Sequence, residues 1–464
     1  MMISSIGQRA SSPLRRGLCV AACGFLLAGF SALATNGLDW NTNQSRVSAD
    51  LKGVNLRSVL EQIAATTGWQ VFLEPETLHD VSTKFTNLSS GEALGRLLGD
   101  VNYALVPGTN ATRLYVFRTS RQRATQQVRP AKAEAREPKP IPNELVVRLK
   151  PGARIDDIAR LLGAKVVGKI DSLNAYRLQF DDAAAADAAR APLANNPDVA
   201  AVESNYTIDP PPTPAASGSA APSLSLQMKA PPSSGRVVVG LIDTAVQPLG
   251  NNLDQFLQKQ LSVAGDSTLD PNSPSHGTAM ADTILRSLQT VTKGSTSVQI
   301  LPVDVYGPNT TTSSFDVANG IVTAVNKGAN VINLSLGSTA DSPVLHDVIN
   351  NAVSQNILLI GAAGNEPVTT PFYPAAYSGV DAVTAIDQGQ LASYANRGSF
   401  VTLGAPGSNV IPFENLAYGV QGTSVSSAYL SGAAAGYMDL NHTGTSQAQS
   451  FLSRNFGVKI SSSK

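Results

Sequence analysis

The sequence predicts an α/β protein in which a mostly parallel sheet is sandwiched by helices and preceded by two small α+β domains. From residue 237 onward, continuous apolar runs alternate with helical patterns, which is typical of strands that helices cover on both faces. Two polar stretches with prolines and few large apolar residues, 119–143 and 209–235, have the composition of linkers. With 464 residues, the chain is also too long for a single ordinary domain. We therefore expect three folded parts, at residues 38–118, 144–208 and 236–464.

Residues 1–34 have the three regions of a secretory signal peptide. Three arginines precede an apolar run at 17–34, which closes on the small-x-small sequence Ala-Leu-Ala. A single membrane anchor is the alternative, although a run of about 18 residues rich in alanine and glycine is borderline for spanning a bilayer. The segment therefore predicts export, to the periplasm or out of the cell.

Charge and cysteine content exclude two classes of chemistry. Lysine plus arginine and aspartate plus glutamate both count 34, so no basic domain is available and we expect no nucleic-acid partner. Both cysteines, Cys19 and Cys23, lie in the apolar run of the signal. Once the signal is removed, the mature chain has neither disulfides nor thiol chemistry.

The first part, residues 38–118, alternates strands with two helices. A strand-like segment at 46–51 precedes a helix whose apolar residues recur at i, i+3, i+4 and i+7, and a strand, a second helix and two more strands follow. Its segments 50–56, 68–71 and 92–94 resemble the short N-terminal domain of bacterial secretins and outer-membrane receptors. The resemblance implies a periplasmic contact module that binds a cell-envelope protein and has no catalytic role. A generic α+β domain with no retained partner is an equal alternative.

The second part, residues 144–208, begins with an alternating strand closed by a turn. A helix at 155–162, two strands, an alanine-rich helix at 183–194 and a closing strand follow. Over its full length this segment resembles the inhibitory propeptide that precedes subtilisin-like catalytic domains. The resemblance implies an intramolecular inhibitor that templates folding and blocks the active site until it is cut off. An unrelated ferredoxin-like domain is the alternative, but the position directly before the third part favours the propeptide.

Four polar residues of the third part lie at strand ends or helix starts. Asp243 follows an apolar strand, Asn365 follows another, and His276 and Ser424 each open a helical pattern. Taken singly, each is weak, because a strand-ending aspartate is more often a turn residue and a lone histidine is more often structural. Active sites of parallel sheets, however, lie beyond the carboxyl ends of the strands, where such residues meet.

Together, Asp243, His276 and Ser424 form the set that a serine nucleophile needs. Such a nucleophile requires an imidazole as base and a buried carboxylate that fixes the imidazole tautomer. Their order along the chain is the order found in subtilisin, and none of the other three histidines lies in a comparable motif. Asn365 can donate its amide to an oxyanion, a contribution of about 3 kcal/mol in comparable sites.

From residue 237 to the C-terminus, five motifs in order resemble those of subtilisin-like serine proteases. The resemblance implies that Ser335, Leu336 and Gly337 belong to the substrate-binding strand, whose backbone pairs with an extended peptide. It also places Phe372 at the floor of the S1 pocket, where many relatives have a small residue, so we expect a preference for small P1 side chains. The segment after His276 contains no acidic loop, and we expect neither an essential metal ion nor a cofactor.

Five residues near the reacting groups depart from the family's usual pattern without removing a reacting group: Ala245, Ala279, Asp282, Ala428 and Tyr429. The sequence thus predicts a secreted or periplasmic serine endopeptidase that acts on protein or peptide substrates and is made as an autoinhibited precursor. The alternative is a catalytically inactive subtilisin-like scaffold that acts as an envelope binding module through residues 38–118.

Overall fold

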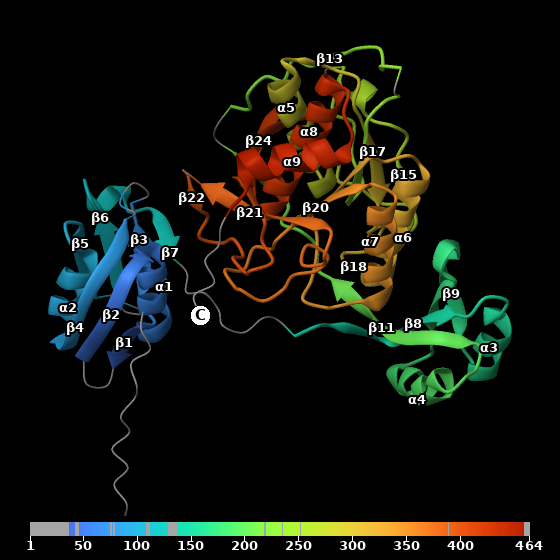
Figure 1. Ribbon diagram of the computed structural model, residues 1–464, viewed down its shortest axis with the longest axis horizontal. Coiled ribbons are helices and arrows are strands. Elements are labelled where there is room, and N and C mark those ends of the chain that lie inside the picture. Colours follow the sequence, from blue (N-terminus) through green and yellow to red (C-terminus); the bar gives the residue numbers. More distant parts are fainter. Residues whose placement is uncertain are drawn as a thin grey trace, which may run out of the picture.

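The computed structural model describes residues 37–41, 46–74, 77, 79–107, 112–128, 137–217, 220–233, 235–250, 252–387 and 389–458. The predicted signal peptide at 1–34 lies outside these residues. Figure 1 shows three parts, which we call the first domain (residues 37–128), the second domain (137–208) and the third domain (235–458). No helix in the described ranges combines the length and the apolar character needed to cross a membrane.

The first domain packs two helices against two small sheets. One sheet has the order β1 (Gly37–Asn41), β2 (Arg46–Asn55), β4 (Asp80–Ser89), and the other has the order β5 (Asn102–Val106), β6 (Arg113–Phe117), β3 (Gln70–Leu73), β7 (Gln126–Val128). The helices are α1 (Leu56–Thr67) and α2 (Ser90–Leu98), and their leucines and valines join one closed core with the strands. Sequence patterns did not indicate β4, because polar residues fill its exposed face.

The second domain is an antiparallel sheet with helices on one face. Its strands are β8 (Pro140–Leu149), β9 (Lys165–Ile170), β10 (Ala175–Gln179) and β11 (Val199–Ile208), and its helices are α3 (Ile155–Leu162) and α4 (Ala183–Ala194). Alternate residues of a strand point to opposite faces. Leu145 and Val147 therefore join the core under α3 and α4, whereas Val146 joins a core of the third domain. The second domain thus uses both faces of its sheet, one inward and one for docking.

The third domain is built on a mostly parallel sheet, as the sequence predicts. Its strand order is β15 (Leu261–Ser262), β17 (Gln299–Asp304), β14 (Val238–Asp243), β19 (Val331–Leu334), β20 (Leu358–Ala362), β21 (Val380–Asp387), β22 (Gln390–Leu391), and β23 (Leu403–Pro406) also pairs with β21. All these pairs are parallel except β21 with β22. The carboxyl ends of the parallel strands consequently meet at one edge.

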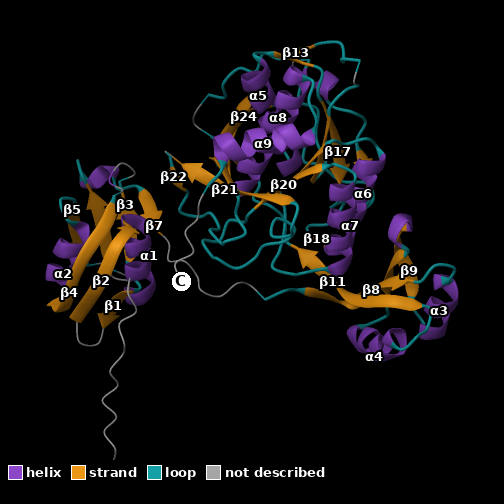
Figure 2. Cartoon of the chain, viewed as in Figure 1, coloured by secondary structure: helices purple, strands orange, loops and turns teal. Residues whose placement is uncertain are grey.

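Helices cover both faces of this sheet (Figure 2). One face packs against α5 (His276–Thr292), α8 (Thr423–Asn441) and α9 (Thr445–Phe456), and the other against α6 (Ser314–Asn326) and α7 (Pro343–Ser354). A hairpin of β24 (Ser408–Phe413) and β25 (Leu416–Gln421) leads directly into α8. Helices α6 and α7 are two of the helical patterns that the sequence shows between its apolar runs.

The linker at 209–235 contains two short strands that its composition did not indicate. Strand β12 (Ala215–Ala216) pairs with β25, and β13 (Gln227–Met228) pairs with β16 (Ser295–Thr296). A third two-residue strand, β18 (Thr312–Ser313), joins the end of β11 to the third domain. These pairings place the linker along the surface of the third domain.

Candidate active site

A buried aspartate and histidine meet at the carboxyl edge of the sheet. Asp243 ends β14 and His276 begins α5, and the His276 Nδ1 atom lies 2.8 Å from Asp243 Oδ1 and 3.0 Å from Oδ2. The two residues are only 1% and 3% exposed. Gly277 makes this approach feasible, since a Cβ atom there would lie 2.1 Å from the Thr244 carbonyl oxygen. A buried carboxylate of this kind fixes the imidazole with its proton on Nδ1.

Helices α5 and α8 run side by side in the same direction, so that His276 and Ser424 lie at the same level. A Cβ atom at Gly432 would lie 2.5 Å from the Ile284 carbonyl oxygen, and one at Gly436 would lie 3.3 Å from Leu288. Gly432 lies as many residues after Ser424 as Ile284 lies after His276, and the same holds for Gly436 and Leu288. The two helix starts therefore face each other, and the small residues of α8 permit the close packing.

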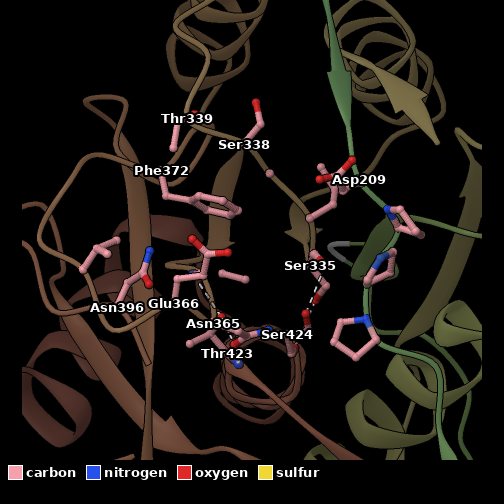
Figure 3. A pocket seen from close by; sticks show the side chains of 18 of the residues that line it. Asp209, Ser335, Ser338, Thr339, Asn365, Glu366, Phe372, Asn396, Thr423 and Ser424 are labelled. Carbon is pink, nitrogen blue, oxygen red and sulfur yellow. Dashed lines mark hydrogen bonds between the residues drawn. The ribbon is translucent and has the colours of Figure 1, made fainter. Parts of the chain in front are cut away.

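The Ser424 hydroxyl does not hydrogen-bond to the imidazole in this structure. It donates to the Ser335 carbonyl at 3.1 Å, while the Ser335 hydroxyl donates to the Ser424 carbonyl at 3.0 Å (Figure 3). The His276 Nε2 atom is buried and has no hydrogen-bond partner among the described residues. The structure thus joins two members of the predicted triad and holds the third, Ser424, against Ser335 of the predicted substrate-binding strand.

Asn365 is held by its amide oxygen. This oxygen accepts hydrogen bonds from the Thr423 amide at 2.8 Å and from the Thr423 hydroxyl at 3.0 Å. Because both bonds use the oxygen, the NH₂ group is left to donate to another group. Gly422, at φ 150°, passes beside this amide, where a Cβ atom would lie 2.9 Å from Nδ2. The carboxamide is therefore oriented next to the Ser424 backbone.

A pocket of about 290 Å³ opens beside Ser424. Ser335, Leu336 and Gly337 line it, as the sequence predicts, together with Asn365 and Phe372. Gly337 and Gly364 both lie against the Phe372 ring, at 2.6 Å and 3.2 Å from where their Cβ atoms would be. Figure 3 shows this ring projecting into the pocket across from Asp209. The ring shortens the space available to a side chain.

The sequence did not indicate several residues that shape the site. Thr423 orients Asn365. Asn333 joins the strand to α8, because its NH₂ group donates to the Ser335 hydroxyl and its oxygen accepts from Ser427 and Ser431. The side chain of Asn333 is fully buried, so these bonds are shielded from water. An asparagine inside an otherwise apolar strand run was the one available signal.

The second domain also reaches the pocket. Strand β11 extends to β18, with Thr207 opposite Ser313 and Ile208 opposite Thr312. Further pocket-lining residues come from the end of this strand, from the linker and from the segment before β8; they are Glu137, Lys139, Thr207, Asp209, Pro210, Pro211 and Pro212. No local sequence pattern predicts this placement, because it depends on how the two domains pack.

Two polar residues of β11 fix the second domain to helix starts of the third. The Glu203 carboxylate accepts from the Ser342 hydroxyl at 2.7 Å and from the Val344 amide at 3.0 Å, at the start of α7. Asn205 accepts from the Phe315 amide at 3.1 Å, at the start of α6. Helix starts present unpaired amides, which such acceptors satisfy. Burial nevertheless raises the pKa of Glu203 to about 7, although these hydrogen bonds oppose the shift.

The five departures from the family pattern leave the reacting groups in place. Ala245, Ala279 and Ala428 are buried and fit the close packing around the site. Asp282 is paired with Arg286 on α5, and burial raises the pKa of its carboxyl. The Tyr429 ring packs edge-on against Phe456, on α9. Within the described ranges, no three or more histidine, cysteine or acidic side chains gather as metal ligands do.

Comparisons with known proteins match the second and third domains. The model of the subtilase family matches residues 234–456, and that of the fervidolysin N-terminal prodomain matches residues 126–205. The chain is 39% identical over 186 residues to the thermostable alkaline protease of Halalkalibacterium halodurans, a match that covers 38% of this chain and 52% of that protein. It is 32% identical over 210 residues to subtilisin Savinase of Lederbergia lenta, covering 43% of this chain and 75% of Savinase. The chain thus spans about half the length of the first of these relatives.

Solved structures share the fold. The crystal structure of fervidolysin from Fervidobacterium pennivorans, a keratinolytic enzyme related to subtilisin, matches with a TM-score of 0.51 and 18% identity over 68% of this chain and 57% of that one. The epidermin leader peptide processing serine protease of Staphylococcus aureus, as an S393A mutant, matches with a TM-score of 0.54 and 18% identity over 67% of this chain and 92% of that one. At this level of identity, the matches show the fold alone.

Proposed function

Because this chain belongs to the subtilase family, we propose that it is an exported serine endopeptidase, made as a precursor that its own second domain inhibits. The observation that carries the proposal is the buried Asp243–His276 pair beside Ser424 at the start of the neighbouring helix. The export of the protein rests on the signal pattern at 1–34 and on relatives such as the minor extracellular protease Epr of Bacillus subtilis.

In the proposed reaction, Ser424 attacks the carbonyl carbon of the scissile peptide bond. His276 takes the hydroxyl proton on Nε2 and later gives it to the leaving amine, while Asp243 stabilises the imidazolium. Asn365 donates its NH₂ group to the oxyanion, since its oxygen is already held by Thr423. Before attack, the Ser424 hydroxyl has to turn from the Ser335 carbonyl toward His276, which is a rotation of one side chain between staggered positions.

A fluorophosphonate, which labels activated serines, tests the enzyme against the inactive scaffold. We expect labelling of the protein after its second domain has been removed, and loss of labelling in Ser424→Ala. Ser426→Ala is the matched control, because this hydroxyl lies two residues further along α8 and donates to the Ala405 carbonyl instead. Absence of labelling in the unaltered protein, or equal labelling of Ser424→Ala, would favour the inactive scaffold.

We predict that Phe372 restricts the P1 side chain. In the unaltered enzyme, peptides with alanine at P1 should be cleaved with higher kcat/KM than peptides with phenylalanine. Phe372→Ala should shift this ratio toward phenylalanine by roughly tenfold or more, since the ring that fills the pocket is gone. Phe451→Ala removes a ring on α9, outside the pocket, and should leave the ratio unchanged. A strong preference of the unaltered enzyme for phenylalanine would reject the assignment.

We predict that the second domain binds the third more weakly as the pH rises toward 7. Docking raises the pKa of Glu203 from about 4.5 to about 7, so the docked state holds a proton that the separated state has lost. The affinity of the second domain for the third is therefore highest below pH 4.5. It falls as the pH rises from there to about 7, and it stays constant above pH 7. After the linker is cut, the dissociation constant of the second domain from the third should be about tenfold larger or more at pH 8 than at pH 5.

Glu203→Gln is the matched variant for this pH effect, because its uncharged amide can accept from the Val344 amide through oxygen while its NH₂ group donates to the Ser342 hydroxyl. Its dissociation constant should change much less between pH 5 and pH 8 than that of the unaltered protein. The same pH slope in both proteins would show that another group is responsible.

We also propose that the first domain contacts a cell-envelope protein through β5. This strand lies at the edge of its sheet, and its Tyr103 and Leu105 are exposed, which suits the addition of a partner strand. Leu105→Lys should weaken retention of the protein at the cell envelope. An unchanged location of this variant, and of a protein that lacks residues 37–128, would leave the first domain without this role.

A further inference from the structure

The segment that joins the second domain to the third crosses the active site from one side to the other. On one side, Ile208 is paired with Thr312 of β18, and the Asp209 carbonyl accepts from the Tyr306 hydroxyl at 3.4 Å. On the other side, Ala215 pairs with Gly419 of β25, the strand that leads into Ser424. Residues 209–214 therefore bridge the cleft, and residues 209–212 line the pocket.

Prolines occupy the centre of this bridge. Pro210, Pro211 and Pro212 line the pocket that Ser424, Ser335 and Asn365 also line. Each of the three peptide bonds that join residues 209 to 212 has a proline nitrogen on its leaving side. Whichever of these bonds lies over Ser424, its cleavage would have to release a proline.

A proline nitrogen resists the last part of the proposed reaction. Its ring carbon Cδ takes the place of the amide hydrogen and crowds the preceding residue, so that the backbone before it is confined to extended conformations. His276 would also have to deliver its proton to a nitrogen that the ring shields. Three prolines in a row further form a stiff left-handed helix that cannot bend to bring a carbonyl to the nucleophile.

We propose that these prolines make the bridge a plug that the protein's own active site cannot cut. The proposal rests on the proposed function and adds a regulatory rule to it. Maturation occurs instead at exposed positions further along the linker, such as Ala220, Ser223 and Ser225, and it is carried out by a second protease molecule. Water then adds across an ordinary amide bond there, with OH going to the acyl carbon and H to the leaving amine.

The test compares the purified full chain with a variant in which Pro210, Pro211 and Pro212 are replaced by alanine. In the unaltered protein, no new N-terminus should be found at residue 210, 211 or 212, and any cut in the linker should become faster as the protein concentration rises. In the alanine variant, the bonds that join residues 209 to 212 should be cut about a hundredfold faster or more, at a rate independent of concentration. Intact mass and N-terminal sequencing give both results, and Ser424→Ala in the alanine variant should abolish this cut.

Two controls separate this proposal from the proposed function. Replacing Pro222, Pro231 and Pro232 with alanine changes prolines of the same linker that do not line the pocket, and it should create no new cut between 209 and 212. Peptidase activity is also measured after a site-specific protease has cut a site inserted after Ala220 and the second domain has been removed. An active enzyme whose unaltered precursor is cut between 209 and 212, or whose alanine variant is not, overturns the plug. An enzyme that stays inactive after release contradicts the proposed function itself.

A separate observation concerns the first domain, which docks on the third through charged residues of α1. Arg57 and Glu61 are only 4% and 5% exposed, although both carry a charge. They are four residues apart, so they lie on the same face of α1. The Arg397 guanidinium donates to Glu61 at 2.6 Å, and Arg57 donates to the Leu391 carbonyl at 2.7 Å. Charged side chains are buried so completely only where they are paired.

We infer that the Glu61–Arg397 pair holds the first domain on the third domain, beside the pocket. Asn396, the residue before Arg397, lines the pocket. The backbone amide of Asn396 donates to the carbonyl of Gly364, which precedes Asn365. The partner of the α1 face is therefore the same chain, which leaves β5 for other proteins. Breaking the pair should release the first domain, since each charge would otherwise remain buried without its partner.

The experiment uses the full chain with a site for a specific protease inserted between residues 129 and 136. After cutting, the first domain should elute with the rest of the protein in gel filtration. Glu61→Arg should release it, the double variant Glu61→Arg with Arg397→Glu should retain it again, and Asp100→Arg, at an exposed position, should have no effect. Release of the unaltered first domain, or its retention in Glu61→Arg, would overturn the inference.

Discussion

In the enzyme freed of its second domain, Ser424→Ala should lower kcat for peptide hydrolysis by about 10⁶-fold. Alanine removes the atom that forms the acyl bond and leaves the rest of the site intact. Ser335, Leu336 and Gly337, which we propose to bind the substrate, line the pocket and are not altered by alanine at 424, so KM should change little. Steady-state kinetics with one peptide substrate measure both constants.

The control for this prediction is again on α8. Ser426→Ala removes an equally buried hydroxyl that bonds to the Ala405 carbonyl, and its kcat should stay close to that of the unaltered enzyme. The melting temperatures of both variants show whether the fold is kept. A Ser424→Ala enzyme that keeps more than about a thousandth of the activity would exclude Ser424 as the nucleophile, since only binding and the oxyanion donor would then remain to explain catalysis.

The fold of the third domain could be predicted because it depends on local patterns. Continuous apolar runs and helical periods recur along the chain, and the observed strands β14, β17, β19 and β20 coincide with four of these runs. The parallel arrangement then follows, since covering helices separate the strands. In the same way, strand ends and helix starts predicted that Asp243 and His276 would meet.

Contacts between domains could not be predicted, because each depends on the packing of separate parts. Strand β18 is two residues long, and only the end of β11 beside it defines it as a strand. The sequence around Glu203 indicates only a strand residue, whereas in the structure its carboxylate accepts from the Val344 amide at the start of α7. The same holds for Thr423, whose place before Ser424 was evident while its bonds to Asn365 were not.

Asp243→Asn should lower kcat by about 10⁴-fold, with the geometry of the site unchanged. The carboxylate now accepts from the proton on His276 Nδ1, at 2.8 Å. An amide in its place can donate to Nδ1, which would move the ring proton to Nε2, the atom that must accept a proton from Ser424. The imidazolium formed in the reaction would also lose the negative charge beside it. We therefore expect a large loss in kcat, a small change in KM and partial recovery at high pH, where hydroxide can replace the base.

The neighbouring strand offers a matched control for this substitution. Asp304 ends β17 directly opposite Asp243 in the parallel pairing, and it is fully buried too. Its carboxylate accepts from the backbone amides of Tyr306 and Gly307 and not from His276. Asp304→Asn therefore changes a buried charge at the same edge of the sheet without touching the imidazole. If the two variants lost activity equally, the effect would come from charge burial in general. A loss confined to Asp243→Asn would assign it to the orientation and charge of His276.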